Sequence, residues 1–353
     1  MSDLRQLFEH PIIQAPMAGG PSRPVLAAAV SAAGGFGFLA AGYKRAEQVR
    51  AEIAQTRTLT DRPFGVNLFV PPATTAGTGT ATAPVDLAAV AAYQARLVPE
   101  AARLGVCLGT ASSDDDDWDA KLTDLLVDPP AAVSFVFGCP SAEVIEAFRA
   151  KGVFVILTVT SAAEAALATA ADALCVQGTE AGAHRATFAN DPDTIDEGTE
   201  LLKLLAEVGQ VSDLPLIAAG GLADGADIAG ALAAGATAAQ LGTAFLRCSE
   251  SGASPAHKAA LADPRFTATA VTRAFSGRPA RGLVNRFLTE HSPYAPAAYP
   301  HLHHLTSPLR RAAAYQEDPD TMALWAGQAY RLATDDPAAD IVTRLAEELS
   351  MAP

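Results

Sequence analysis

Short, mostly apolar runs alternate along the chain with longer stretches in which apolar residues recur at helical spacing. The runs are rich in strand-forming residues and fall at residues 12–16, 36–41, 64–70, 133–138, 153–159, 173–177, 216–220 and 238–242. Because most of them are apolar throughout, they are typical of parallel strands that helices cover. The pattern therefore predicts eight β/α units.

Several of the intervening stretches begin and end with helix signals. Ser141 and Ser161 are expected N-caps, and Glu164, three residues after Ser161, gives a capping-box pattern. Asp224 is expected to begin a later helix that ends at Gly235. These signals favour helices between the strands.

Eight β/α units can close into a barrel or form an open, doubly wound sheet. Residues suited to ligand binding follow the strands from Pro16 to Thr243, whereas an open sheet would concentrate them at one switch point. The sequence thus predicts an α/β fold, a (β/α)₈ TIM barrel made of residues 1–250 and 310–353.

Three stretches depart from the repeat. Residues 251–309 are expected to form a small lobe that covers the barrel mouth. Residues 71–84 read as a loop rich in Pro, Gly, Thr and Ala. Residues 322–349 are amphipathic and are expected to form helix packed back on the barrel.

The charge of the chain limits its partners. The formal net charge of the 353 residues is −14, which disfavours nucleic acid and anionic membranes. Four scattered cysteines without a CxxC spacing predict reduced thiols, and the N-terminus lacks a signal-peptide pattern. We therefore expect a soluble, cytoplasmic protein.

Two polar clusters imitate metal sites. The aspartate run at residues 114–117 is interpreted as a solvated loop or helix start. The sequence HLHH at residues 301–304 lies in a Pro-rich segment without nearby acidic ligands and is interpreted as solvated. No metal site is expected.

Two strand ends carry glycines suited to a phosphate. The sequence LIAAGG at residues 216–221 and AAQLGT at residues 238–243 end the seventh and eighth strands. Loops after these strands often bind phosphate through backbone N–H groups and a helix N-terminus. Glycine lets the backbone approach the anion closely.

The segment QGTEAGAHR, residues 177–185, follows the sixth strand. It places His184 where barrel active sites lie, and histidine exchanges protons near neutral pH. Asn67 interrupts the third strand, and a buried amide needs hydrogen-bond partners from local backbone or from a ligand. Asn67 and Gln177 together suit a planar ring such as a flavin, and no GxGxxG follows the first strand.

Motifs along most of the chain resemble the nitronate monooxygenases. They include HPIIQAPMAGG, FGVNLFVPP, QGTEAGAHR, AAGGLADG, QLGTAFL and TRAFSGRPARGLVNRF, in the order of that family. The resemblance implies a barrel that binds flavin mononucleotide (FMN) and oxidises alkyl nitronates, such as propionate 3-nitronate, with O₂ to a carbonyl product and nitrite. A homo-oligomer is compatible with it.

The resemblance also implies roles for particular residues. His184 would face the substrate. The residues that would contact the cofactor are Ala15, Pro16, Met17, Asn67, Gln177, Gly182, Gly220, Gly221, Gln240, Leu241, Gly242 and Thr243.

Two departures from the family bear on the substrate. Ala183 and Ala186 stand where relatives often have glycine, and a positive φ at position 183 would strain alanine. Residues 156–159 offer no second histidine, which favours the anionic nitronate over neutral nitroalkanes. The alternatives are a flavin-dependent enoyl-acyl-carrier-protein reductase that uses NAD(P)H, which shares the EAG-x-H turn, and a non-catalytic flavin or phosphate-ligand binding protein.

Overall fold

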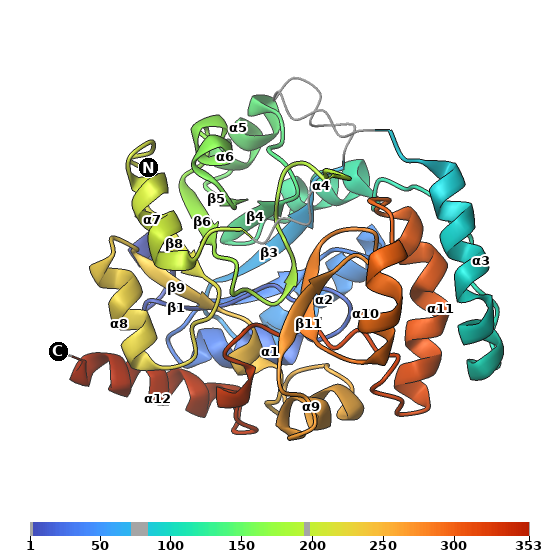
Figure 1. Cartoon of the computed structure of the whole chain (residues 1–353). Helices are drawn as coiled ribbons and strands as arrows, with labels where there is room; N and C mark the ends of the chain where they lie inside the picture. The colour runs from blue at the N-terminus through green and yellow to red at the C-terminus, as the bar shows by residue number, and fades with distance from the viewer. Residues whose placement is uncertain (1–2, 72–83, 194–197, 353) are drawn as a thin grey trace.

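The computed structural model of the chain describes residues 3–71, 84–193 and 198–352. Eight parallel strands form a nearly closed barrel, which confirms the predicted fold class (Figure 1). The strands follow the order β1-β9-β8-β6-β5-β4-β3-β2, and a parallel bridge from Ile13 to Phe36 joins the two ends. Their bounds are β1 Ile12–Gln14, β2 Gly37–Ala40, β3 Phe64–Phe69, β4 Ala132–Val136, β5 Phe154–Val159, β6 Ala173–Gln177, β8 Leu216–Ala219 and β9 Ala238–Leu241.

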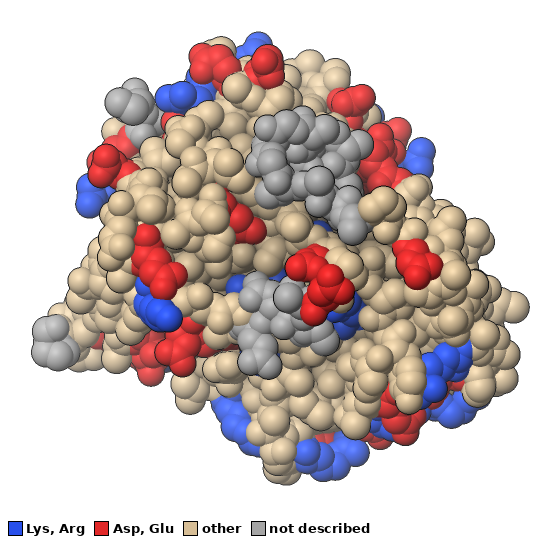
Figure 2. Space-filling view, turned by 45° about the horizontal axis from the view of Figure 1, so that its top comes forward, with Lys and Arg blue, Asp and Glu red and all other residues tan. Residues whose placement is uncertain are grey.

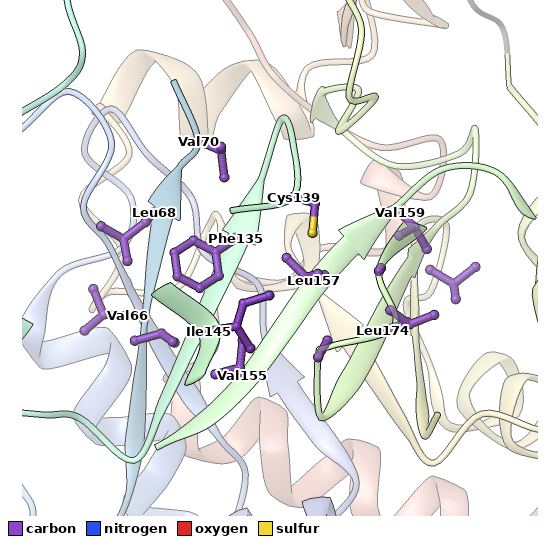
Figure 3. Close-up of a cluster of buried hydrophobic side chains, with 14 of the residues drawn as sticks. Val66, Leu68, Val70, Phe135, Cys139, Ile145, Val155, Leu157, Val159 and Leu174 are labelled. Atoms are coloured by element: carbon purple, nitrogen blue, oxygen red, sulfur yellow. The ribbon is translucent and has the colours of Figure 1, made fainter. Parts of the chain in front are cut away.

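Helices surround the barrel and bury the outward faces of its strands. Phe135 of β4 and Leu157 of β5, for example, pack with Ile145 of a covering helix (Figure 3). Their side chains are at most 1% exposed, as expected for parallel strands covered by helices. The covering helices are α1 Pro24–Ala32, α2 Ala46–Leu59, α4 Trp118–Val127, α5 Ala142–Ala150, α6 Ala162–Leu167, α7 Leu201–Gly209, α8 Gly225–Ala233 and α12 Ala338–Met351.

The predicted helix starts are mostly confirmed. Ser141 and Asp224 are N-caps whose side chains accept first-turn N–H groups, and Ser161 accepts the N–H of Glu164 at 3.2 Å. The prediction of a full capping box at Ser161 is wrong, because the side chain of Glu164 does not bond back to the backbone N–H of Ser161. The carboxylate of Glu164 instead accepts the N–H groups of Thr160 and Phe188, at 2.6 and 2.7 Å. Glu164 therefore connects two loops at the barrel mouth through these hydrogen bonds.

A second layer lies over one side of the mouth. Its antiparallel sheet has the order β10-β11-β7, with β10 Thr269–Thr272, β11 Ala280–Leu283 and β7 Ala183–His184. Its helices are α3 Leu87–Leu104, α9 Pro255–Ala262, α10 Arg286–His291 and α11 His301–Tyr315, of which α3 and α11 lie side by side (Figure 1). These elements share a separate hydrophobic core, to which residues on both sides of the range 251–309 contribute. The boundaries of the lobe stay a prediction.

The C-terminal segment is α-helical only in its last part, and a short 3₁₀ helix, Tyr330–Leu332, precedes it. Helix α12 packs against α1 and α8, as the sequence predicts, but residues 322–337 are not the expected helix. They cross the barrel mouth instead. Gly327 donates to Oγ1 of Thr243 at 2.9 Å, and Gln328 donates to the carbonyl of Glu180 at 3.0 Å. Hydrogen bonds to barrel loops thus replace those of a helix.

Two observations complete the fold. Most of the predicted loop at residues 71–84 lies outside the described residues. No helix in the described part of the chain is long and apolar enough to cross a membrane.

Candidate active site

A cavity of about 870 Å³ opens at the carboxyl ends of the barrel strands. Acidic and basic side chains are mixed over one face of the molecule and do not form a patch of one sign (Figure 2). Every site residue predicted from the sequence lines this one cavity: Ala15, Pro16, Met17, Asn67, Gln177, Gly182, His184, Gly220, Gly221, Gln240, Leu241, Gly242 and Thr243. The fold therefore brings together positions on or directly after five barrel strands, β1, β3, β6, β8 and β9.

One side of the cavity is a cradle of backbone, formed by Gly220, Gly221 and Gly242. The first two have φ values of +116° and +75°, which favour glycine. A β-carbon at Gly221 would lie 2.9 Å from Cβ of Glu180, so this position also lacks room. Gly221 and Gly242 donate none of the backbone hydrogen bonds found among the described residues. Their N–H groups suit an anion.

The backbone N–H groups at the start of helix α8 are less available to a phosphate than the sequence suggested. The N–H of Gly225 donates to Glu348 at 2.9 Å, and that of Asp227 donates to Asp224 at 2.9 Å. These carboxylates already satisfy first-turn groups and offset the positive end of the helix dipole. The cradle glycines, rather than the first turn of α8, present the N–H groups that a phosphate could accept.

Asn67 and Gln177 hold their surroundings in place and still face the cavity. Nδ2 of Asn67 donates to the hydroxyl of Ser134 on the neighbouring strand at 2.9 Å. Its Oδ1 makes no hydrogen bond within the described part of the chain. Nε2 of Gln177 donates to the carbonyl of His184 at 3.1 Å, and its Oε1 accepts the N–H of Ala186 at 2.9 Å. Gln177 therefore fixes the turn that carries the histidine.

The turn itself is strained at Ala183, whose φ is +62°. The sequence departure at this position thus falls where glycine is favoured, and the left-handed conformation costs alanine about 1–2 kcal/mol. Pairing of β7 with β11 holds the conformation, because Ala183 and His184 lie opposite Arg281 and Ala280. The second layer therefore sets the position of the histidine.

The imidazole of His184 lies in an aromatic cage. The rings of Phe137, Tyr299 and Trp325 have their centroids 5.8–5.9 Å from its own. Its Nε2 lies 2.8 Å from the hydroxyl of Ser276. Burial lowers the pKa of His184 to about 3, with the charges of two arginines adding to the effect. The imidazole is consequently neutral at neutral pH.

Ser276 also bears on where the proton of His184 resides. Its hydroxyl oxygen lies 3.2 Å from the carbonyl oxygen of Arg278, which can only accept. When the hydroxyl donates to that carbonyl, Nε2 of His184 is the donor and Nδ1 keeps its lone pair. Nδ1 makes no hydrogen bond among the described residues, so it is available to a ligand.

A second wall of the cavity was missed by sequence reasoning. The interpretation of residues 301–304 as solvated is wrong for His303, which is 8% exposed and lines the cavity. Its ring stacks on Tyr43 with centroids 3.8 Å apart, and Tyr299 donates to the hydroxyl of Tyr43 at 3.4 Å. Arg310, two turns further along α11, lines the same wall. His303 and Arg310 are seven residues apart, and this spacing, which places both on one face of a helix, was the available signal.

The aspartate run marks a helix start, as interpreted, but part of it is not solvated. Asp117 is the N-cap position of α4. Asp116 contacts Lys121 at 2.8 Å and accepts the N–H of Tyr43 at 2.8 Å. Burial raises the pKa of Asp116 to about 6. The run therefore anchors Tyr43 at the cavity wall.

A barrel whose strand ends join a glycine cradle to a neutral, caged histidine has the arrangement of an enzyme that binds a phosphate-bearing ligand. The profile of the family described as nitronate monooxygenase matches residues 2–348. The chain belongs to this family, which is flavin-dependent and whose members are oxidoreductases.

Individual relatives agree with this assignment. Nitronate monooxygenase from Pseudomonas aeruginosa is 42% identical over 351 residues, which cover 97% of each chain. The structure of nitroalkane oxidase from Streptomyces ansochromogenes is 52% identical and covers 99% of each chain, with a TM-score of 0.94. FabK from Thermotoga maritima is 27% identical, covers 98% of this chain and 95% of its own, and has a TM-score of 0.73.

Proposed function

We propose that the chain is an FMN-dependent enzyme that oxidises alkyl nitronates, such as propionate 3-nitronate, with O₂ to a carbonyl product and nitrite. The observation that carries the proposal is the neutral, caged His184, which shares one cavity with the glycine cradle. Membership of the nitronate monooxygenase family supports the same reaction.

The cavity suits FMN. The N–H groups of Gly221 and Gly242 would donate hydrogen bonds to its phosphate, because neither donates a backbone hydrogen bond among the described residues. The open Oδ1 of Asn67 would accept a hydrogen bond from the ring system or the ribityl chain. The bound flavin would supply the redox chemistry, while the protein supplies orientation and electrostatics.

His184 would orient the substrate rather than carry a charge. A nitronate already has its carbanion character, so no proton must be removed before oxidation. In the tautomer in which Ser276 donates to Nε2, the Nδ1–H of the neutral ring would donate a hydrogen bond to a nitronate oxygen in the aromatic cage. The cage would also exclude water from the reacting carbon.

A neutral nitroalkane is a second candidate substrate. The relative from Streptomyces is named a nitroalkane oxidase. The open Nδ1 of His184 favours this candidate, because a neutral imidazole can accept a proton from carbon. Thr158 is a residue of β5 that lines the cavity, and its hydroxyl offers no base. We therefore expect nitronates to be used faster than the corresponding nitroalkanes.

The proposal is tested with the purified protein. Its visible spectrum should show a bound flavin, and oxygen consumption should begin on addition of propionate 3-nitronate. A yellow protein that consumes no oxygen with any alkyl nitronate would refute the proposed reaction and favour the non-catalytic binding protein.

The reductase alternative has weaker support, because FabK is a more distant neighbour than the nitroalkane oxidase. Anaerobic mixing with NADH and with NADPH distinguishes the two enzymes. A nitronate-oxidising enzyme should keep its flavin spectrum for minutes, whereas rapid bleaching would support the reductase.

A further inference from the structure

The wall formed by Tyr43, Tyr299, His303 and Arg310 presents hydrogen-bond donors without a negative partner. Arg310 directs Nη2 to the carbonyl of His303 at 3.0 Å and Nε to the hydroxyl of Thr306 at 3.1 Å. Its Nη1 makes no hydrogen bond among the described residues. This nitrogen belongs to a side chain that lines the cavity.

The charged groups around Arg310 do not compensate its positive charge. The charged or titratable groups that act on its pKa are Tyr43, Arg311 and Tyr299, and none is a carboxylate. Two other cations at the cavity, Lys44 and Arg45, are paired: Lys44 lies 2.6 Å from Glu52, and Arg45 lies 3.9 Å from Asp117. A partly buried guanidinium without an anion is costly unless a ligand supplies one.

Arg310 also fixes the proton of His303. Its Nη2 lies 3.2 Å from Nδ1 of His303, and a guanidinium can only donate. Nδ1 must therefore be the acceptor, so the neutral ring carries its proton on Nε2. Nε2 makes no hydrogen bond in the part of the chain that the structure describes. The stack on Tyr43 holds the ring in this position.

We propose that Nη1 of Arg310 and the Nε2–H of His303 form an anion-binding subsite that holds an oxyanion of the substrate. This inference rests on the proposed function for the identity of the substrate. The oxyanion is either the nitronate group itself or a carboxylate further along the same molecule. The ring of Tyr299 lies between this subsite and His184, with centroids 6.5 and 5.9 Å from His303 and His184.

Two substrates and three variants test the subsite. Propionate 3-nitronate carries a carboxylate, and the nitronate of 3-methyl-1-nitrobutane replaces that group with an uncharged branch of the same shape. The variants are Arg310→Gln, Arg310→Lys and, as a control that also removes one positive charge, Arg96→Gln. Arg96 is exposed on α3 and stacks on Tyr294, away from the cavity lining.

Arg310→Gln should raise the KM for propionate 3-nitronate by about tenfold or more while kcat changes much less. Arg310→Lys should recover part of the loss, because lysine keeps the charge without the planar fork. An equal rise in KM for the uncharged analogue identifies the nitronate as the bound oxyanion. A rise confined to propionate 3-nitronate identifies the carboxylate.

An unchanged KM for both substrates in a folded, flavin-loaded Arg310→Gln would overturn the proposal. If that variant does not fold, His303→Phe keeps a flat ring on Tyr43 and removes both the Nε2–H and the Nδ1 that accepts from Arg310, so its KM should rise about threefold or more. Succinate binding, followed by the flavin spectrum, tests the subsite without turnover. It should weaken in Arg310→Lys, and equal affinity in both proteins would contradict the proposal. A wild-type enzyme that oxidises no nitronate but binds succinate would refute the reaction and leave the subsite intact.

Discussion

The two sides of the cavity are built by different means. The glycine cradle consists of backbone from two neighbouring strand ends, and its geometry depends on positive φ and missing β-carbons. The opposite wall consists of side chains from two distant parts of the sequence, Tyr43 from one and Tyr299, His303 and Arg310 from the other. Backbone N–H groups suit a phosphate whichever side chains surround them, whereas side chains can change with the substrate. We therefore expect changes in the cradle to affect cofactor retention and changes in the wall to affect substrate use.

The largest effect should follow a change in the cradle. Gly221→Val places a branched side chain at φ +75° and 2.9 Å from Glu180, which should cost about 2 kcal/mol or more. The purified variant should be colourless or release its flavin on gel filtration. Gly230→Ala is the matched control, because Gly230 lies inside α8 with nothing within 4 Å of an added β-carbon.

The control should keep its flavin and gain about 0.5–1 kcal/mol in the free energy of unfolding. A yellow, fully loaded Gly221→Val protein would break the comparison, because the wall would then have to retain the cofactor.

A medium effect is expected on the pH dependence of the free energy of unfolding, through His303 of the wall. Burial lowers the pKa of His303 below its usual value near 6.5, so the folded protein keeps this ring neutral while the unfolded chain takes up a proton. The stabilisation is present above pH 6.5 and is lost as the pH falls below it. By pH 5 the loss should be about 2 kcal/mol from this residue alone. Urea unfolding at pH 7 and pH 5 measures it.

His303→Phe removes this titrating group while keeping the stack on Tyr43. The decrease in unfolding free energy between pH 7 and pH 5 should therefore be smaller in the variant than in the wild type. Equal decreases in both proteins would mean that His303 is protonated in the folded state.

The smallest effect should follow relief of strain in the turn. Ala183→Gly removes the cost of φ +62°, partly offset by the greater freedom of glycine in the unfolded chain. We expect an increase of about 0.5–1 kcal/mol in the free energy of unfolding, measured by urea denaturation. A decrease would show that the methyl group of Ala183 contributes packing that outweighs the strain.

The cradle and the barrel could be predicted because their signals are local. Most strands are largely apolar contiguous runs, and Gly220, Gly221 and Gly242 directly follow two such runs. His184 could be predicted for the same reason, since it lies a few residues after β6. In each case a few adjacent residues are sufficient to indicate the structure.

The wall could not be predicted in this way because it depends on packing between distant segments. His303 is buried only because α11 lies against Tyr43, which the aspartate run positions from a third segment. Residues 322–337 have the pattern of an amphipathic helix, yet their contacts to Thr243 and Glu180 outweigh that preference. Such contacts have no local signature.

The central claim is that the chain oxidises nitronates beside His184, and nitrite release tests it most directly. Wild-type protein and His184→Asn, each with its flavin content measured, are supplied with propionate 3-nitronate and O₂. The wild type should release nitrite as oxygen is consumed, and the variant should keep its flavin but lose about a hundredfold or more in kcat/KM. Equal nitrite release by the two proteins, or none from the wild type, would contradict the account.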